Sequence, residues 1–217
     1  MIDRDADNAR ETEAGYDAVA SDYDDRTSSR SGDAEAFAQR FLDVLAADSV
    51  VVDLGCGSGR DLDRFAEHGH RAVGLDRSAQ LLALAGPSSC IRGDLRFLPL
   101  APGSVGGIWS HASLLHVKAE ALTSTLVEWE RVLRPGGVVG LSTSLGGDSG
   151  WELAPASRSR VPKMEGGARR WFVHHDRDHL LEALRSRSWE LLDVSIRSSH
   201  RDWLQVMARR EGEDIVS

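Results

Sequence analysis

The stretch VVVDLGCGSGRDL, residues 50–62, determines how the rest of the chain is interpreted. Its apolar, β-branched start predicts a buried strand. Three glycines at alternate positions follow, and residues 58–68 have the spacing of a helix. Glycine lets a ligand lie against bare backbone, and a helix N-terminus behind it supplies free N–H groups. We therefore expect a nucleotide or nucleoside site at the carboxyl end of the first strand of an α/β sheet.

Two acidic residues narrow the choice of ligand. The glycine spacing is G-x-G-x-G, whereas the dinucleotide fingerprint is G-x-G-x-x-G. Asp53 directly before the turn disfavours a pyrophosphate and favours a cationic ligand. A second predicted strand, residues 70–76, ends in Asp76, which is placed to accept hydrogen bonds from ribose hydroxyls. Together these features favour S-adenosyl-L-methionine (SAM) as the ligand.

At this point the sequence resembles the class I SAM-dependent methyltransferases. The resemblance rests on VVDLGCGSG, GLDRS, GDL and RVLRPGGVVGLS, in that order, and covers roughly residues 16–143. It implies an α/β, Rossmann-like doubly wound sheet of seven strands. That sheet would be mostly parallel, with a C-terminal antiparallel hairpin and helices on both faces. The chain departs from the family at Gly106-Gly107, where the fourth strand usually begins with an acidic residue.

Composition limits the choice of partners. The chain has 217 residues, enough for one domain with a full core. Its net charge is −8, and residues 1–35 alone hold eleven acidic residues against four arginines. Without a large basic face, DNA and long RNA are poor partners. No apolar run has membrane-spanning length, the polar N-terminus is no signal peptide, and Cys56 and Cys90 suggest no disulfide framework. We expect a cytoplasmic monomer or homodimer.

The predicted organisation has three parts. Residues 1–32 are an acidic segment, disordered over residues 1–12, and the resemblance makes residues 16–24 a lid over the cofactor. The alternative for the lid is an amphipathic helix that packs on the sheet. Residues 33–210 are the SAM-binding domain, with a substrate flap at about 144–175, and residues 211–217 are a frayed tail. The flap is rich in basic residues that could steer an anionic acceptor, although a solvated flap is an equal alternative.

Further elements follow from helical and strand periodicity. Phe37, Phe41 and Leu45 predict a helix that covers one face of the sheet. A second amphipathic helix is predicted over residues 119–133. Asp176 is expected to cap a helix over residues 177–187. Residues 189–196 and 203–208 predict two antiparallel strands.

The resemblance also implies the cofactor contacts. Asp94 would bond the adenine amino group, and the N–H of Leu95 a ring nitrogen. The full set is Tyr16, Tyr23, Asp53, Gly55, Cys56, Gly57, Gly59, Asp76, Arg77, Asp94, Leu95, Ser110 and His111. Candidate proton acceptors are His111, which directly follows the fourth strand, and then His174 and His175 at the end of the flap. A hydrogen-bonded structural role is the alternative for each histidine.

The expected function is SAM-dependent methyl transfer to oxygen or nitrogen of a small molecule, with S-adenosylhomocysteine as the product. Specialised metabolism is one setting for such an enzyme, and RNA or protein acceptors stay open. One alternative is an NAD-dependent oxidoreductase, which the missing third glycine and Asp53 disfavour. Another is a non-catalytic SAM-binding regulatory protein. His175 and His179 lack a clear third ligand, so no metal is expected.

Overall fold

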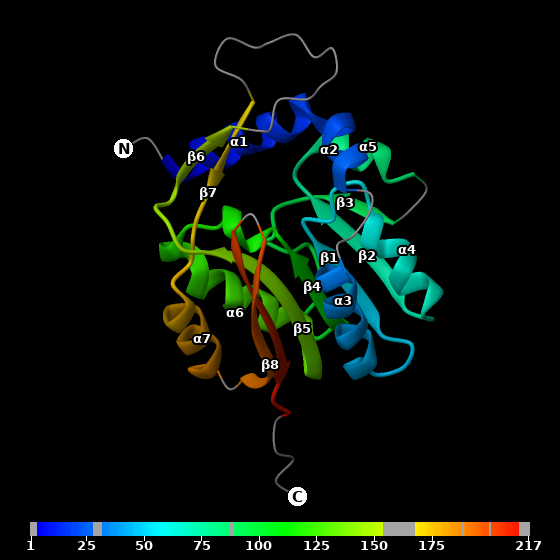
Figure 1. Ribbon diagram of the computed structural model, residues 1–217. Coiled ribbons are helices and arrows are strands. Elements are labelled where there is room, and N and C mark those ends of the chain that lie inside the picture. Colours follow the sequence, from blue (N-terminus) through cyan, green and yellow to red (C-terminus); the bar gives the residue numbers. More distant parts are fainter. Residues whose placement is uncertain are drawn as a thin grey trace, which may run out of the picture.

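The computed structural model describes residues 4–27, 32–86, 89–153, 168–187, 189–199 and 201–212. A seven-stranded sheet in the order β3-β2-β1-β4-β5-β9-β8 forms its centre (Figure 1). The strands are β1 (Val50–Leu54), β2 (Arg71–Asp76), β3 (Cys90–Arg92), β4 (Val105–His111), β5 (Leu133–Leu145), β8 (Trp189–Ser198) and β9 (Asp202–Arg210).

The direction of the strands confirms the expected Rossmann-like arrangement. Strands β3, β2, β1, β4 and β5 run parallel to one another. Strand β9 runs antiparallel to both β5 and β8, which makes the predicted C-terminal hairpin. The carboxyl ends of the five parallel strands therefore meet at one edge of the sheet, where such folds bind their ligands.

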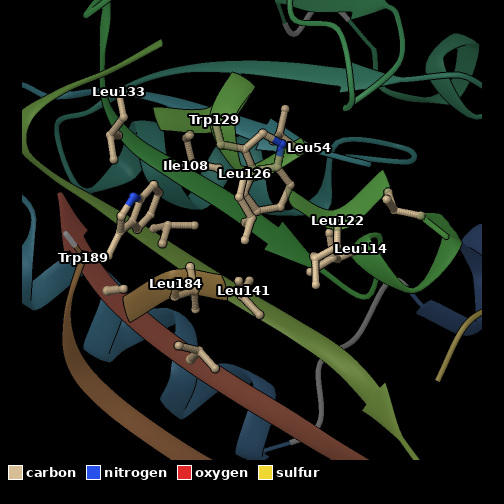
Figure 2. Close-up of a cluster of buried hydrophobic side chains, with 14 of the residues drawn as sticks. Leu54, Ile108, Leu114, Leu122, Leu126, Trp129, Leu133, Leu141, Leu184 and Trp189 are labelled. Carbon is tan, nitrogen blue, oxygen red and sulfur yellow. The ribbon is translucent and has the colours of Figure 1, made fainter. Parts of the chain in front are cut away.

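Helices cover both faces of the sheet. On one face, α3 (Gly32–Val44) and α4 (Arg60–Glu67) pack Phe37, Phe41 and Phe65 around Trp109. The other face is covered by α6 (Leu122–Val132) and α7 (Arg177–Arg185), whose leucines pack with Trp129 and Trp189 (Figure 2). The predicted helical stripes therefore face the core, as their spacing requires.

Capping residues fix the ends of two helices. The Ser78 hydroxyl accepts from the N–H of Leu81 at the start of α5 (Ala79–Leu84). The Asp176 carboxylate accepts from the N–H of His179 at 2.8 Å, which confirms the predicted cap of α7. Both side chains satisfy a backbone donor that the helix itself leaves free.

The two glycines at the start of β4 have a packing reason. A Cβ added to Gly107 would lie 2.8 Å from Leu45 and 3.1 Å from the ring of Phe41. A Cβ added to Gly106 would lie 2.8 Å from the hydroxyl of Ser49. Any side chain here would push α3 away from the sheet. The departure from the family pattern therefore accompanies a close approach of helix and strand.

The N-terminal segment corrects one prediction. Residues 4–12 were expected to be disordered, but they belong to α1 (Arg4–Ala18), which is followed by α2 (Ala20–Thr27). Both helices cross the carboxyl edge of the sheet (Figure 1). Glu13 pairs with Arg77 at 3.1 Å and with Arg92 at 2.6 Å, and the Ser78 hydroxyl donates to Asp17 at 2.5 Å. The prediction was wrong because these partners lie far away in the sequence.

The flap contains regular structure that periodicity did not indicate. Strands β6 (Gly150–Leu153) and β7 (Arg169–Phe172) form a separate two-stranded antiparallel sheet beside α1 (Figure 1). The flap residues 154–167, with three of its five basic side chains, and the tail residues 213–217 lie outside the described residues. In the described part of the chain, no helix is both long and apolar enough to cross a membrane.

Candidate active site

A cavity of about 120 Å³ lies between the N-terminal helices and the carboxyl ends of β1, β2 and β4. The N-terminal helices α1 and α2, which we call the lid, contribute one wall. The glycine-rich turn, the ends of β2 and β3, and the segment after β4 contribute the others. The lining residues used below are Asn8, Thr12, Glu13, Tyr16, Tyr23, Gly55, Gly57, Asp76, Arg77, Asp94, Leu95, Arg96, His111, Ser113, His116, Lys118 and Trp171.

The glycine-rich turn presents bare backbone to this cavity. Gly55 has φ +79°, and an added Cβ would lie 2.3 Å from the Cβ of Ser113. Gly57 has φ +57°, and an added Cβ would meet no atom within 4 Å. Because Gly57 lines the cavity, a side chain there would occupy the space in which a ligand lies. The turn therefore fits a ligand that rests directly on the backbone.

Asp76 connects this turn to the end of β2. Its Oδ2 accepts from the N–H of Gly57 at 2.9 Å, and its Oδ1 accepts from the N–H of Ser78 at 2.8 Å. Removal from water raises the pKa of Asp76, although these backbone hydrogen bonds oppose the rise. A carboxylate offers about four acceptor positions, so capacity remains for a ligand with two neighbouring hydroxyls.

Asp94 follows β3 at the same edge of the sheet, and its surroundings differ from those of Asp76. Its carboxylate accepts from Nη2 of Arg96 at 2.7 Å and from Nη1 of Arg77 at 2.5 Å. Removal from water favours a higher pKa, but the hydrogen bonds and charge of Arg96 and the charge of Arg77 outweigh it, so the pKa of Asp94 is lowered. An adenine amino group at Asp94 would therefore share the carboxylate with two guanidinium groups.

His111 brings an imidazole to the same cavity from the end of β4. Its ring stacks on that of Trp109, with 5.9 Å between the ring centres and 9° between the planes. The Nε1–H of Trp109 donates to Oδ2 of Asp61 at 2.8 Å, which fixes the indole. The core below the sheet edge thus orients the His111 ring.

Comparison with known proteins shows which proteins this chain is similar to. Residues 52–141 match the family model described as a methyltransferase domain. The chain is 32% identical over 139 residues to malonyl-(acyl-carrier protein) O-methyltransferase of Enterobacter lignolyticus, which covers 62% of this chain and 53% of that protein. Residues 52–141 therefore carry a methyltransferase domain, and the chain is similar to SAM-dependent methyltransferases.

Other proteins to which the chain is similar are named for different acceptors. The 18S rRNA (guanine-N(7))-methyltransferase of Schizosaccharomyces pombe is 33% identical over 106 residues, which is 45% of this chain and 39% of that protein. The 1,6-didemethyltoxoflavin-N1-methyltransferase of Burkholderia thailandensis, solved with S-adenosylhomocysteine, has a TM-score of 0.70 at 20% identity and covers 95% of this chain and 90% of that one. The chain spans about half the length or less of these curated relatives.

The other two candidate histidines do not line the cavity. The His175 side chain is buried, and its Nε2 lies 3.2 Å from the carbonyl oxygen of Leu114. Burial lowers the pKa of His175. His174 lies 3.5 Å from Glu152 on the flap. Of the three predicted proton acceptors, only His111 shares the cavity with the glycine-rich turn.

The predicted cofactor residues divide in a similar way. Most of them line the cavity. This is expected, because they follow the carboxyl ends of parallel strands, which meet at one edge of the sheet. Four do not, namely Asp53, Cys56, Gly59 and Ser110. Asp53 and Ser110 are buried within their strands, and Gly59 has φ +84° at the start of α4. None of the four faces the cavity, and their assignment as direct cofactor contacts stays a prediction.

His116 is a cavity residue that sequence reasoning did not select as a candidate. Its Nδ1 lies 2.7 Å from the carbonyl oxygen of Trp171, so Nδ1 carries the hydrogen. Its Nε2 therefore accepts from the hydroxyl of Tyr16, at 2.8 Å. This chain of hydrogen bonds joins the lid, the segment after β4 and the flap. Removal from water lowers the pKa of His116 to about 4, which keeps the ring neutral.

The shifted pKa of His116 predicts a pH dependence of stability. The unfolded chain binds the proton more tightly, because its histidine pKa is near 6.5. The free energy of unfolding should therefore fall as the pH drops from about 6.5 towards 4. In His116→Gln, urea unfolding between pH 7 and 5 should show a slope shallower by up to about 1.4 kcal/mol per pH unit. The surface variant His68→Gln is the control, and an equal slope in His116→Gln and wild type would contradict the assignment.

Two lid residues that were missed, Asn8 and Thr12, share one helix face with the predicted contact Tyr16. Asn8, Thr12 and Tyr16 follow one another at intervals of four residues, and all three line the cavity. The Thr12 hydroxyl also accepts from the N–H of Trp171 at 2.9 Å. The four-residue spacing was available in the sequence. It went unused because this face is polar, whereas helix prediction looks for apolar stripes.

Proposed function

We propose that this protein transfers the methyl group of SAM to an oxygen or nitrogen atom of a small molecule. The observation that carries the proposal is the meeting of Gly57, Asp76 and His111 in one cavity beneath the lid. The match of residues 52–141 to a methyltransferase domain supports the same reaction, and a cavity enclosed by lid and strand ends favours a small acceptor. The relatives act on acceptors as different as a carrier-protein thioester and a ribosomal RNA, so none of these acceptors is carried over.

In this proposal the residues of the chain hold the cofactor rather than react with it. SAM supplies a methyl group already activated by its sulfonium charge. Asp76 accepts hydrogen bonds from the ribose hydroxyls, and the bare backbone at Gly55 and Gly57 lets the nucleoside lie close. Tyr16 and Tyr23 close the site from above and exclude water, which strengthens electrostatic interactions inside it.

The adenine end would lie at Asp94 and Leu95. Because Asp94 is already bound by Arg77 and Arg96, we propose that the adenine amino group displaces part of this contact. Arg77 also pairs with Glu13 of the lid. Occupation of the adenine end would therefore be coupled to the position of α1 through Arg77.

His111 is the proposed proton acceptor where the methyl acceptor must lose a proton. We expect His111→Ala to lower kcat about 100-fold, because general base catalysis contributes roughly 10²–10⁴-fold. The affinity for S-adenosylhomocysteine should change less than about threefold, since the glycine-rich turn and Asp76 remain. His179→Ala, on the exposed surface of α7, is the control variant. Wild-type kcat in His111→Ala would make His111 a packing residue.

The proposed function is tested first by calorimetric titration with SAM, S-adenosylhomocysteine and NAD. Micromolar binding of the two adenosyl ligands without binding of NAD is the expected result. Binding of NAD alone would overturn the proposal and favour a redox enzyme. Methyl transfer from labelled SAM in a screen of small acceptors then separates an enzyme from a non-catalytic SAM-binding protein, because only turnover distinguishes them.

A further inference from the structure

A buried cation lies on the flap strand β7, next to the cavity. Arg170 is only 8% exposed. Its guanidinium carbon lies 4.9 Å from the ring centre of Tyr16 and 5.2 Å from that of Phe172. Among the described residues, Nε of Arg170 has no hydrogen-bond partner. Arg170 also makes a side-chain hydrogen bond to Tyr16, but a neutral hydroxyl and two aromatic rings do not balance a buried positive charge.

The carboxylate that could pair with Arg170 is bound elsewhere. Glu152 stands directly opposite Arg170 in the β6–β7 ladder. Its two oxygens accept from Arg201, at 3.0 and 2.7 Å, in a fork geometry that commits the carboxylate to that side chain. His174 lies 3.5 Å away on the same carboxylate. Counting Arg170, Arg201 and Glu152 together, one positive charge remains inside the fold.

The effect of this charge extends to the wall of the cavity. Tyr16, Tyr23 and His116 all line the cavity. Removal from water raises the pKa of Tyr16 and of Tyr23, and the charge of Arg170 opposes both rises. Removal from water also lowers the pKa of His116, and the charge of Arg170 lowers it further. The positive charge of Arg170 therefore acts on three side chains of the cavity wall, although the lid as a whole is acidic.

We propose that Arg170 binds a carboxylate group of the methyl acceptor. A guanidinium presents planar, paired donors that match a carboxylate. One uncompensated positive charge fits a monoanion better than a phosphate dianion. Arg170 contacts Tyr16 and directly precedes Trp171, both of which line the cavity, so the carboxylate would lie at the Tyr16 end, beyond the glycine-rich turn proposed to hold the cofactor. The inference rests on the proposed function, because it assigns the acceptor half of the same site.

The test measures binding of small carboxylates to the protein saturated with S-adenosylhomocysteine. The probes are four monocarboxylates, namely propionate, butyrate, benzoate and phenylacetate, each compared with its primary amide by calorimetry. We expect at least one carboxylate to bind, and its amide to bind about tenfold or more weakly, because hydrogen bonds to charged groups are the stronger ones. Arg170→Met should weaken the carboxylate by about tenfold or more, and Arg170→Lys should restore part of the affinity.

Two further variants make the result specific to this charge. Arg169→Met removes a cation from the same strand, but Arg169 is half-exposed and pairs with Glu11, so carboxylate affinity should not change. Glu152→Gln removes the negative charge opposite Arg170, and carboxylate affinity should rise severalfold. A decrease in Glu152→Gln, unchanged affinity in Arg170→Met, or equal affinity for carboxylate and amide would overturn the inference.

Cofactor binding distinguishes a failure of the proposed function from a failure of the Arg170 assignment. Titration with S-adenosylhomocysteine alone tests the proposed function and reports whether each variant is folded. Retained affinity in Arg170→Met, within about threefold, assigns any loss of carboxylate binding to the acceptor half of the site. If wild type binds S-adenosylhomocysteine but none of the four carboxylates, the assignment of Arg170 fails and the proposed function stands. If S-adenosylhomocysteine does not bind, both fail.

Discussion

Asp76→Ala should weaken the binding of S-adenosylhomocysteine by about 100-fold or more, because two hydrogen bonds to a charged acceptor are worth roughly 1.5–3 kcal/mol each. The same side chain accepts from the N–H groups of Gly57 and Ser78, so its removal also releases the glycine-rich turn. Calorimetric titration measures the change directly. The effect should fall on binding more than on folding, since Asp76 is only partly buried.

The control for this variant is Asp178→Ala. Asp178 is an exposed carboxylate on α7 that pairs with Arg177. Its loss changes the net charge by the same amount as Asp76→Ala, but it leaves the cavity intact. Asp76→Asn keeps the shape of the side chain and should lie between alanine and wild type, because the amide offers one acceptor oxygen instead of two. Unchanged affinity in Asp76→Ala would remove Asp76 from the cofactor site.

Trp109→Ala should lower the free energy of unfolding by about 3–5 kcal/mol, the range for truncating a buried aromatic side chain. Trp109 is fully buried, and the rings of Phe37 and Phe41 both lie 5.0 Å from it. The indole also donates to the buried carboxylate of Asp61, which would lose this donor. Urea unfolding followed by circular dichroism gives the difference.

Two further variants are compared with Trp109→Ala in the same unfolding experiment. Trp109→Phe keeps an aromatic ring in the core and should cost less, although the hydrogen bond to Asp61 disappears. Phe97→Ala, at a side chain that is 73% exposed, should change the free energy of unfolding by no more than about 0.5 kcal/mol. Equal stability of Trp109→Ala and Phe97→Ala would contradict the described core.

The pairing of Trp109 with His111 links this core to the site. The two rings stack, so a variant that empties the Trp109 position should also loosen His111. We therefore expect Trp109→Phe to affect turnover more than cofactor affinity, in the same direction as His111→Ala. Comparison of these two variants shows whether the orientation of His111 matters beyond its presence.

The sequence by itself determined the fold around the proposed cofactor site. Strand, glycine-rich turn and helix are consecutive in the chain, and their geometry depends on local properties, namely β-branched residues, glycine φ angles and helical spacing. Asp76 and Asp94 were found because each ends a predicted strand, and the ends of parallel strands meet at one edge. The C-terminal hairpin and the cap at Asp176 were predicted for the same local reasons.

Only the tertiary structure decided which residues surround the proposed acceptor half of the site. The helix over residues 4–12 and the pair of Tyr16 with His116 depend on contacts between residues 100 or more positions apart. Arg170 lacks Glu152 as a partner because Arg201 binds that carboxylate. A sequence shows that acidic and basic residues are present, but not which of them pair. Burial and pairing are properties of the folded chain, and they distinguish a surface arginine such as Arg169 from a buried one such as Arg170.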